Sequence, residues 1–277
     1  MKSKLFDYVE RDNWVYNLSG LTKLIGFILL TFASMYTYDI RCILGILILS
    51  FTVLKMSGIT FSQIKMMLYY VAAFLLLNQV LTFLLAPTYG TEIYGTSHEI
   101  IRFSERYVLT QEQLLYQVTK LFKYVSVIPL GMLFLLTTNP SEFASSLNGV
   151  KISYRGCYAV ALTLRYFPDI LRDYNDISLA QQSRGLDMSK KEKTSTRIKN
   201  VLNICVPLIF STLQRIDVIS NAMDLRGFGK HKKRTWYARK PMQKSDYVCL
   251  TACAGVALVV FGIAMFINGG RFWNPFY

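Results

Sequence analysis

The chain has 277 residues, of which 52% are hydrophobic and 17% are charged, and its 31 lysines and arginines against 17 acids give a formal net charge of +14. Charge-free apolar runs of about 20 residues exclude an ordinary soluble protein, because such runs are long enough to cross a bilayer. The five cysteines are scattered without a CxxC pair, which argues against a disulfide framework.

Five apolar segments are predicted to span the membrane. In chain order these segments cover residues 21–38, 41–57, 66–86, 121–138 and, within 246–277, the charge-free run Val248–Ile267. The second segment is short for a bilayer, so Arg41 and Lys55 must snorkel toward the interfaces. The fourth ends at Asn139-Pro140, a dipeptide that signals a turn. The pattern predicts an all-α polytopic membrane protein.

The charges beside the spans predict the orientation of the chain. The segment 139–245 holds 19 lysines and arginines against 8 acids, whereas the connection 87–117 holds 2 against 4. Basic loops stay in the cytoplasm. We therefore expect a cytoplasmic N-terminus, an N-terminal membrane domain (1–138), a cytoplasmic coupling domain (139–245), and a C-terminal transmembrane helix with a short external tail (246–277).

Two long helices are predicted within the basic segment. Residues 155–185 and about 197–227 carry apolar residues near helical spacing. Each helix has one proline in its body, Pro168 or Pro207, which should kink it because a backbone hydrogen bond is lost.

Both predicted helices end in the same way, with an arginine followed by a glycine. Ser183-Arg184-Gly185 closes the first helix and Leu225-Arg226-Gly227 closes the second. A single Arg-Gly end is ordinary local chemistry, since the arginine favours the helix dipole and the glycine can adopt the left-handed conformation. Two matched ends suggest instead two arginine contacts with docked proteins, because a guanidinium makes paired hydrogen bonds to carboxylates or carbonyls.

These motifs resemble those of the T-component family of energy-coupling factor (ECF) transporters, which includes the cobalt-transport Q subunit. The similar stretches are QQSRGLD at 181–187, NAMDLRGFG at 221–229, Asn17-Leu18-Ser19, Leu21-Thr22-Lys23, Thr138-Asn139-Pro140 and LRYFP at 164–168. Departures are Ser183 and Leu225, where the family often has alanine, and Gly20, where proline is common. The resemblance covers nearly the whole chain.

The resemblance implies a non-catalytic scaffold in the cell membrane with two kinds of protein partner. Arg184 and Arg226, flanked by Ser183, Gly185, Leu225 and Gly227, would dock into two ABC-type ATPase subunits. The long helices would support a small membrane-embedded substrate-binding S component, whose toppling releases its ligand inward. The substrate stays open among vitamins, cobalt and nickel, and the two ATPases can be identical or different.

The sequence predicts no cofactor in this chain. It lacks GxxxxGK[ST], and Gly227-Phe228-Gly229-Lys230 is its nearest approach, so ATP and Mg²⁺ would be bound by the partner ATPases. The basic run Lys230–Arg234 beside a span is better suited to membrane lipid headgroups than to nucleic acid.

Two alternatives remain on the sequence alone. Asp169, Asp173 and Asp176 share a helix face, and a DxxxD pair is typical of membrane prenyl-type transferases that hold Mg²⁺ on diphosphates. The chain has one such acidic cluster instead of two, and Arg165 and Arg172 lie close enough for ordinary ion pairing. The second alternative, the permease of a conventional ABC importer, would normally offer one coupling motif.

Overall fold

The structure is a computed structural model that describes residues 13–59, 61–102, 107–186, 194–231 and 235–275. The chain forms two compact units: residues 1–139 together with 240–277, and residues 140–239. Parts of three predicted features fall outside the described residues: the N-terminus predicted to be cytoplasmic, the run Lys230–Arg234, and Asp187 at the end of the QQSRGLD stretch.

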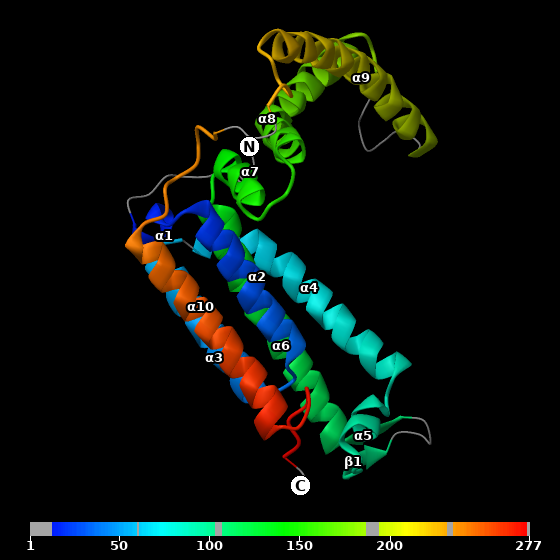
Figure 1. Cartoon of the computed structure of the whole chain (residues 1–277). Coiled ribbons are helices and arrows are strands. Elements are labelled where there is room, and N and C mark those ends of the chain that lie inside the picture. The colour runs from blue at the N-terminus through cyan, green and yellow to red at the C-terminus, as the bar shows by residue number, and fades with distance from the viewer. Residues whose placement is uncertain (1–12, 60, 103–106, 187–193, 232–234, 276–277) are drawn as a thin grey trace. The chain divides into compact units, whose positions relative to one another are not determined.

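Unit 1 consists mainly of five apolar helices, and it has a small hairpin. The helices are α2 (Gly20–Tyr36), α3 (Ile40–Met56), α4 (Phe61–Leu85), α6 (Gln111–Thr137) and α10 (Lys244–Gly262), the last continued by a π-helical turn, Ile263–Ile267. Short helices α1 (Trp14–Asn17) and α5 (Tyr89–Tyr94) flank them, and strands β1 (Glu99–Arg102) and β2 (Val108–Thr110) pair antiparallel. The helices α2, α3, α6 and α10 lie side by side, and α4 stands apart from α2, α3 and α10 (Figure 1). An all-α membrane fold is thereby confirmed.

Four helical stretches of the described chain are long and apolar enough to cross a membrane. They are Met67–Leu85, Gln111–Thr137, Ile198–Leu225 and Lys244–Ile267. Helices α2 and α3 have 17 residues each, or about 26 Å, which is shorter than a hydrocarbon core of about 30 Å. At one end of α3, Arg41 pairs with Asp39 at 2.9 Å, so its charge is held at the helix end.

Helix α6 begins ten residues before the predicted start of its span at 121. Lys120 and Lys123 interrupt the apolar run in the sequence, and the fold accommodates both. The Lys120 ammonium donates to Thr82 Oγ1 at 2.6 Å, and that of Lys123 lies 3.4 Å from the ring centroid of Tyr38. These contacts compensate for the partial desolvation of two cations, which the sequence pattern could not foresee.

The hydrophobic core of unit 1 lies where α2, α3, α6 and α10 converge. Its buried residues are Leu30, Ala33, Cys42, Ile46, Leu130, Ala257 and Val260. The small side chain of Ala33 is fully buried, which lets neighbouring helices approach closely at this level.

Two charged side chains close one end of the bundle. The Asp246 carboxylate accepts from the backbone N–H groups of Ser19 and Gln243, both at 2.8 Å. The Lys23 ammonium donates to the carbonyl oxygens of Thr137 at 2.8 Å and Tyr16 at 3.2 Å. The start of α2, the end of α6 and the start of α10 therefore lie at the same end of unit 1.

The opposite end joins the turn between α2 and α3 to the C-terminal tail. The Tyr38 N–H donates to the Arg271 carbonyl at 2.7 Å, and Asn268 Nδ2 donates to Asp39 Oδ2 at 3.0 Å. Burial raises the pKa of Asp39, but hydrogen bonds from Arg41 and Asn268 outweigh it and hold this pKa below its ordinary value. Helix α10 thus runs parallel to α2.

Unit 2 is entirely helical in its described part. It contains α7 (Pro140–Gly149), α8 (Tyr154–Ser183) and α9 (Thr194–Leu225). Helix α7 packs against the start of α8, and α8 packs against α9. Figure 1 shows the two long helices lying across each other.

The Asp246 contact generates a stability prediction. Asp246→Asn removes one of two acceptor oxygens, so one buried N–H of Ser19 or Gln243 loses its partner. We expect the free energy of unfolding to fall by about 1–3 kcal/mol, as for an unsatisfied buried donor. Thermal unfolding of the purified protein checks this, with Tyr247→Phe on the exposed first turn of α10 as the control. An unchanged melting temperature for Asp246→Asn would show that the carboxylate does not hold the helices together.

Candidate functional site

The first predicted arginine motif lies at the end of α8 in a defined cap. The N–H of Leu186 donates to the Gln181 carbonyl at 3.1 Å, and the N–H of Gly185 donates to the Gln182 carbonyl at 3.0 Å. Gly185 has φ +89°, in the left-handed region that glycine adopts without steric cost. This pair of bonds is a Schellman motif with Arg184 at the C-cap position.

The second motif ends α9 with the same bonds at equivalent positions. The N–H of Phe228 donates to the Met223 carbonyl and the N–H of Gly227 to the Asp224 carbonyl, both at 2.9 Å. Gly227 has φ +68°. Arg226 therefore occupies the position in α9 that Arg184 occupies in α8, so the repeat seen in the sequence is also a repeat of backbone geometry.

The two tips present different neighbours beside the arginine. Ser183 donates its hydroxyl to the Leu179 carbonyl at 3.0 Å, so this polar group is already used within α8. Leu225 is 90% exposed and offers an apolar surface. Arg184 is exposed and makes no ion pair with any residue that the structure describes. Both tips can thus contact another protein, and they are not chemically equivalent.

An ion pair joins the two long helices at matched distances from their tips. Arg215 of α9 contacts Asp173 of α8 at 2.6 Å, with both side chains partly buried. Each member of the pair precedes the arginine of its own helix by eleven positions, which is roughly 16 Å along a helix axis. The crossing point therefore has two arms of equal length, each ending in an arginine.

Pro168 and Pro207 lie within α8 and α9, and both helices continue past them. A proline in a helix interior removes one backbone hydrogen bond. Each proline lies on the opposite side of the contact between Asp173 and Arg215 from the arginine of its own helix. The kinks at these prolines stay predictions.

An aromatic cluster that the sequence reading missed holds the second tip against the start of α8. The rings of Phe228 and Tyr158 are tilted by 39° with centroids 4.8 Å apart, and the ring centroids of Tyr154 and Trp236 are 5.4 Å apart. Trp236 Nε1 donates to Asn148 Oδ1 of α7 at 3.1 Å, and Arg155 donates to the Gly229 carbonyl at 3.3 Å. The spacing of Tyr154 and Tyr158, one helical turn apart, was the only signal of this cluster in the sequence.

Two of the three aspartates of α8 form ion pairs with arginines. Asp169 lies 3.5 Å from Arg172 on the exposed surface, and Asp173 pairs with Arg215 of the neighbouring helix. The pairing of Asp169 with Arg172 is the ordinary contact within one helix that the sequence predicted, whereas the pairing of Asp173 with α9 depends on how the two helices cross. In the described residues, no three histidine, cysteine or acidic side chains form a group that could hold a metal ion.

The structure also places the one cysteine of unit 2 that is fully buried. Cys157 near the start of α8 donates its thiol to the Ile152 carbonyl at 3.7 Å. Burial raises the pKa of this thiol, which keeps it protonated. Cys157 is therefore a packing residue with a free thiol.

The ion pair between Asp173 and Arg215 predicts a measurable coupling between α8 and α9. Asp173→Asn and Arg215→Gln should each lower the free energy of unfolding of the protein by about 1 kcal/mol. The double variant should lose less than the sum of the two, since either change alone removes the attraction. Thermal unfolding of the three variants checks this. Arg172→Gln, whose partner is exposed, serves as the control, and strictly additive losses would contradict the coupling.

Comparison with known proteins places this arrangement in a family. The sequence matches the model of the family described as cobalt transport protein (CbiQ) over residues 11–237. Several curated relatives carry the description "energy-coupling factor transporter transmembrane protein EcfT". That of Streptococcus equi subsp. equi is 23% identical over 276 residues, which is 94% of each chain. That of Lactococcus lactis subsp. cremoris is 25% identical over 248 residues, or 86% of this chain and 89% of the relative.

Other relatives match over shorter stretches. The protein of Staphylococcus aureus is 34% identical over 102 residues, which is 37% of this chain and 38% of the relative. This chain covers 58% of the relative from Leuconostoc gelidum and 55% of that from Limosilactobacillus fermentum. The family match, in contrast, includes both arginine motifs and most of the chain. The chain therefore belongs to the cobalt transport protein family (CbiQ), the T-component family of energy-coupling factor transporters, and is a multi-pass membrane protein.

Proposed function

We propose that this chain couples two cytoplasmic ABC-type ATPases to a small substrate-binding S component and so drives uptake of a vitamin or a transition-metal ion. The observation that carries the proposal is the pair of identical arginine C-caps on two crossed helices. ATP and Mg²⁺ are bound by the ATPases, and this chain transmits movement without catalysing a reaction.

The topology of unit 1 supports a cytoplasmic location for α8 and α9. The end of α6 and the start of α10 lie at the same end of the bundle, because Lys23 contacts Thr137 and Asp246 contacts Ser19. The segment between α6 and α10 must therefore cross the membrane an even number of times.

Helix α9 is apolar enough to cross the membrane. A single crossing, however, would put the start of α10 on the opposite side of the membrane from the end of α6. Helix α8 cannot supply a second crossing, because five charged residues lie in its middle: Arg165, Asp169, Arg172, Asp173 and Asp176. Zero crossings between α6 and α10 remain, so both long helices stay on one side of the membrane.

The basic residues at this end favour the cytoplasmic side. Four lysines lie at the end of the bundle that carries Asp246, near the start of α2, the end of α3 and the start of α10. They are Lys23, Lys55, Lys240 and Lys244. The opposite connection, between α4 and α6, carries more acids than bases in the sequence. By the positive-inside rule, the N-terminus is cytoplasmic and the C-terminus external.

Exposed apolar residues on the long helices support the S component as a further partner. Leu179 of α8 and Ile209, Phe210 and Leu213 of α9 are each at least half exposed although α8 and α9 contact each other. Helices of a coupling unit that leave such side chains uncovered need another apolar surface to bury them. A small hydrophobic membrane protein offers that surface.

The rival activities are less well supported. A transferase would need Asp169 and Asp173 available to Mg²⁺, and each is paired with an arginine. A conventional ABC permease would contact its ATPases through one coupling motif, whereas this chain has two of equal geometry. The arginine caps therefore favour the coupling role.

The docking role predicts the result of removing the arginine charges. Arg184→Ala and Arg226→Ala should each weaken recovery of the ATPases with the tagged chain at least tenfold, since each loses its paired hydrogen bonds. Affinity purification in detergent from the native membrane, followed by mass spectrometry, checks this. Arg172→Ala, an exposed arginine on the same helix α8, is the matched control.

The outcomes are distinct. Loss of the ATPases with the chain still inserted in the membrane supports docking, and the co-purified S component identifies the substrate class. Full recovery of the ATPases with the double arginine variant would overturn the proposal, as would loss of a metal-dependent transferase activity on replacing Asp169 and Asp173.

A further inference from the structure

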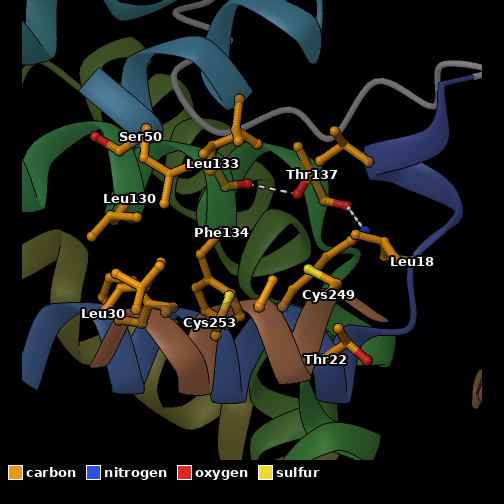
Figure 2. A pocket seen from close by; sticks show the side chains of 18 of the residues that line it. Leu18, Thr22, Leu30, Ser50, Leu130, Leu133, Phe134, Thr137, Cys249 and Cys253 are labelled. Carbon is orange, nitrogen blue, oxygen red and sulfur yellow. Dashed lines mark hydrogen bonds between the residues drawn. The ribbon is translucent and has the colours of Figure 1, made fainter. Parts of the chain in front are cut away.

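A large apolar cavity lies within unit 1, at the end of the bundle that carries Asp246 and Lys23. Its volume is about 490 Å³, within the roughly 300–1,000 Å³ typical of ligand pockets. Helices α2, α3, α6 and α10 all contribute to its wall. Figure 2 shows Phe134 and Leu133 of α6 in this wall, together with Cys249 and Cys253 of α10.

The cavity borders the hydrophobic core of the bundle at one end. Leu30, Leu130 and Val256 line its deep end, and they belong to or pack against the hydrophobic core of the bundle. Leu49 of α3 and Val248 of α10 also line it and are 40% and 67% exposed. Its wall therefore reaches the surface of unit 1 on both α3 and α10.

The depth of the cavity matches one leaflet of a bilayer. Its wall on α10 runs from Ser245 to Val256, which is roughly 16 Å along a helix axis. Half of a hydrocarbon core of about 30 Å is nearly the same length. Water would leave its hydrogen bonds unmade in so apolar a space, and an empty cavity of this size would forfeit packing contacts.

Three lysines lie at the end of unit 1 where Lys23 and Ser245 line the cavity. The ammonium groups of Lys23 and Lys240 both donate to the Tyr16 carbonyl, at 3.2 and 3.0 Å, so two positive charges meet at one oxygen. Lys244 is the first residue of α10, next to Ser245 of the cavity wall. An anion beside these residues would be favoured by charge, and Trp14 at the same end has the amphipathic ring common at membrane interfaces.

We propose that this cavity binds one acyl chain of an anionic phospholipid, whose phosphate lies beside Lys240 and Lys244. The apolar wall accepts the chain, the depth fits one leaflet, and the lysines select the headgroup. The lipid fills the gap that α3 and α10 leave between them and so forms part of the wall of the bundle.

Native mass spectrometry of the full chain in its native complex tests this proposal. Vesicles of phosphatidylcholine alone and of phosphatidylcholine with phosphatidylglycerol supply the lipid. We expect one bound phosphatidylglycerol on the wild type. Ala252→Phe fills the cavity and should reduce that occupancy at least tenfold. Leu258→Phe lies on an exposed face of the same helix and should leave it unchanged.

A second variant tests the headgroup without changing the packing. Lys240→Gln with Lys244→Gln keeps hydrogen-bond donors but removes two charges, so the preference for phosphatidylglycerol over phosphatidylcholine should fall at least fivefold. Equal occupancy by both lipids in the wild type would overturn the proposal. So would retention of the lipid by Ala252→Phe at the wild-type level.

The alkylation rates of the two cysteines in the cavity wall give an independent test of whether a lipid chain occupies the cavity. Alkylation of Cys249 and Cys253 by a membrane-permeant maleimide should be at least tenfold slower in phosphatidylglycerol-containing vesicles than in lipid-free detergent. Equal rates in both would show that no chain occupies the cavity. None of these three measurements has ATPase binding as its readout, so the proposal and the coupling function can fail separately.

Discussion

Backbone groups at helix ends need partners wherever they are buried, and this requirement determines the layout of the membrane unit. The carboxylate of Asp246 takes up the N–H groups at the start of α2 and before α10, and the ammonium of Lys23 takes up the carbonyl at the end of α6. Such contacts are strong because one partner is charged. They bring the point where the chain leaves the membrane unit next to the point where it returns, so the whole of 140–239 can lie on one side.

Because the contacts of Asp246 and Lys23 complete the membrane unit by itself, the long helices α8 and α9 belong to a separate compact unit. They carry their own ion pair, Asp173 with Arg215, and their own aromatic cluster around Phe228. In the proposed coupling function, a displacement applied to one arginine tip would be transmitted to the other helix through the contact between Asp173 and Arg215. Two ATPases that close toward each other would therefore move both helices together, while the membrane unit keeps its bundle contacts.

The same bundle is packed tightly at one level and loosely at another. Ala33 and Ile46 are almost fully buried in the core, yet nearer to Lys23 the helices α3 and α10 leave an apolar cavity. A membrane protein can retain such a gap because lipid chains are available to fill it, whereas a soluble protein would have to leave it empty or wet. In a membrane protein, lipid atoms as well as protein atoms can therefore fill the space between helices.

The sequence by itself determined the features that depend on neighbouring residues. Apolar runs predicted the five helices α2, α3, α4, α6 and α10. Of these, α4, α6 and α10 hold stretches that are long and apolar enough to cross a membrane, which is a property of a continuous stretch. The Arg-Gly pairs predicted both helix ends, because a left-handed glycine stops a helix locally. The family followed from the same motifs.

Only the tertiary structure decided which distant residues meet. The sequence did not show that Arg215 pairs with Asp173, because the two residues are 42 positions apart and their approach depends on how α9 crosses α8. It placed the start of α6 too late, because the contacts that accommodate Lys120 and Lys123 come from Thr82 and Tyr38 on other elements. The cavity was likewise invisible, since its wall combines four helices whose spacing is fixed by packing and not by the order of residues.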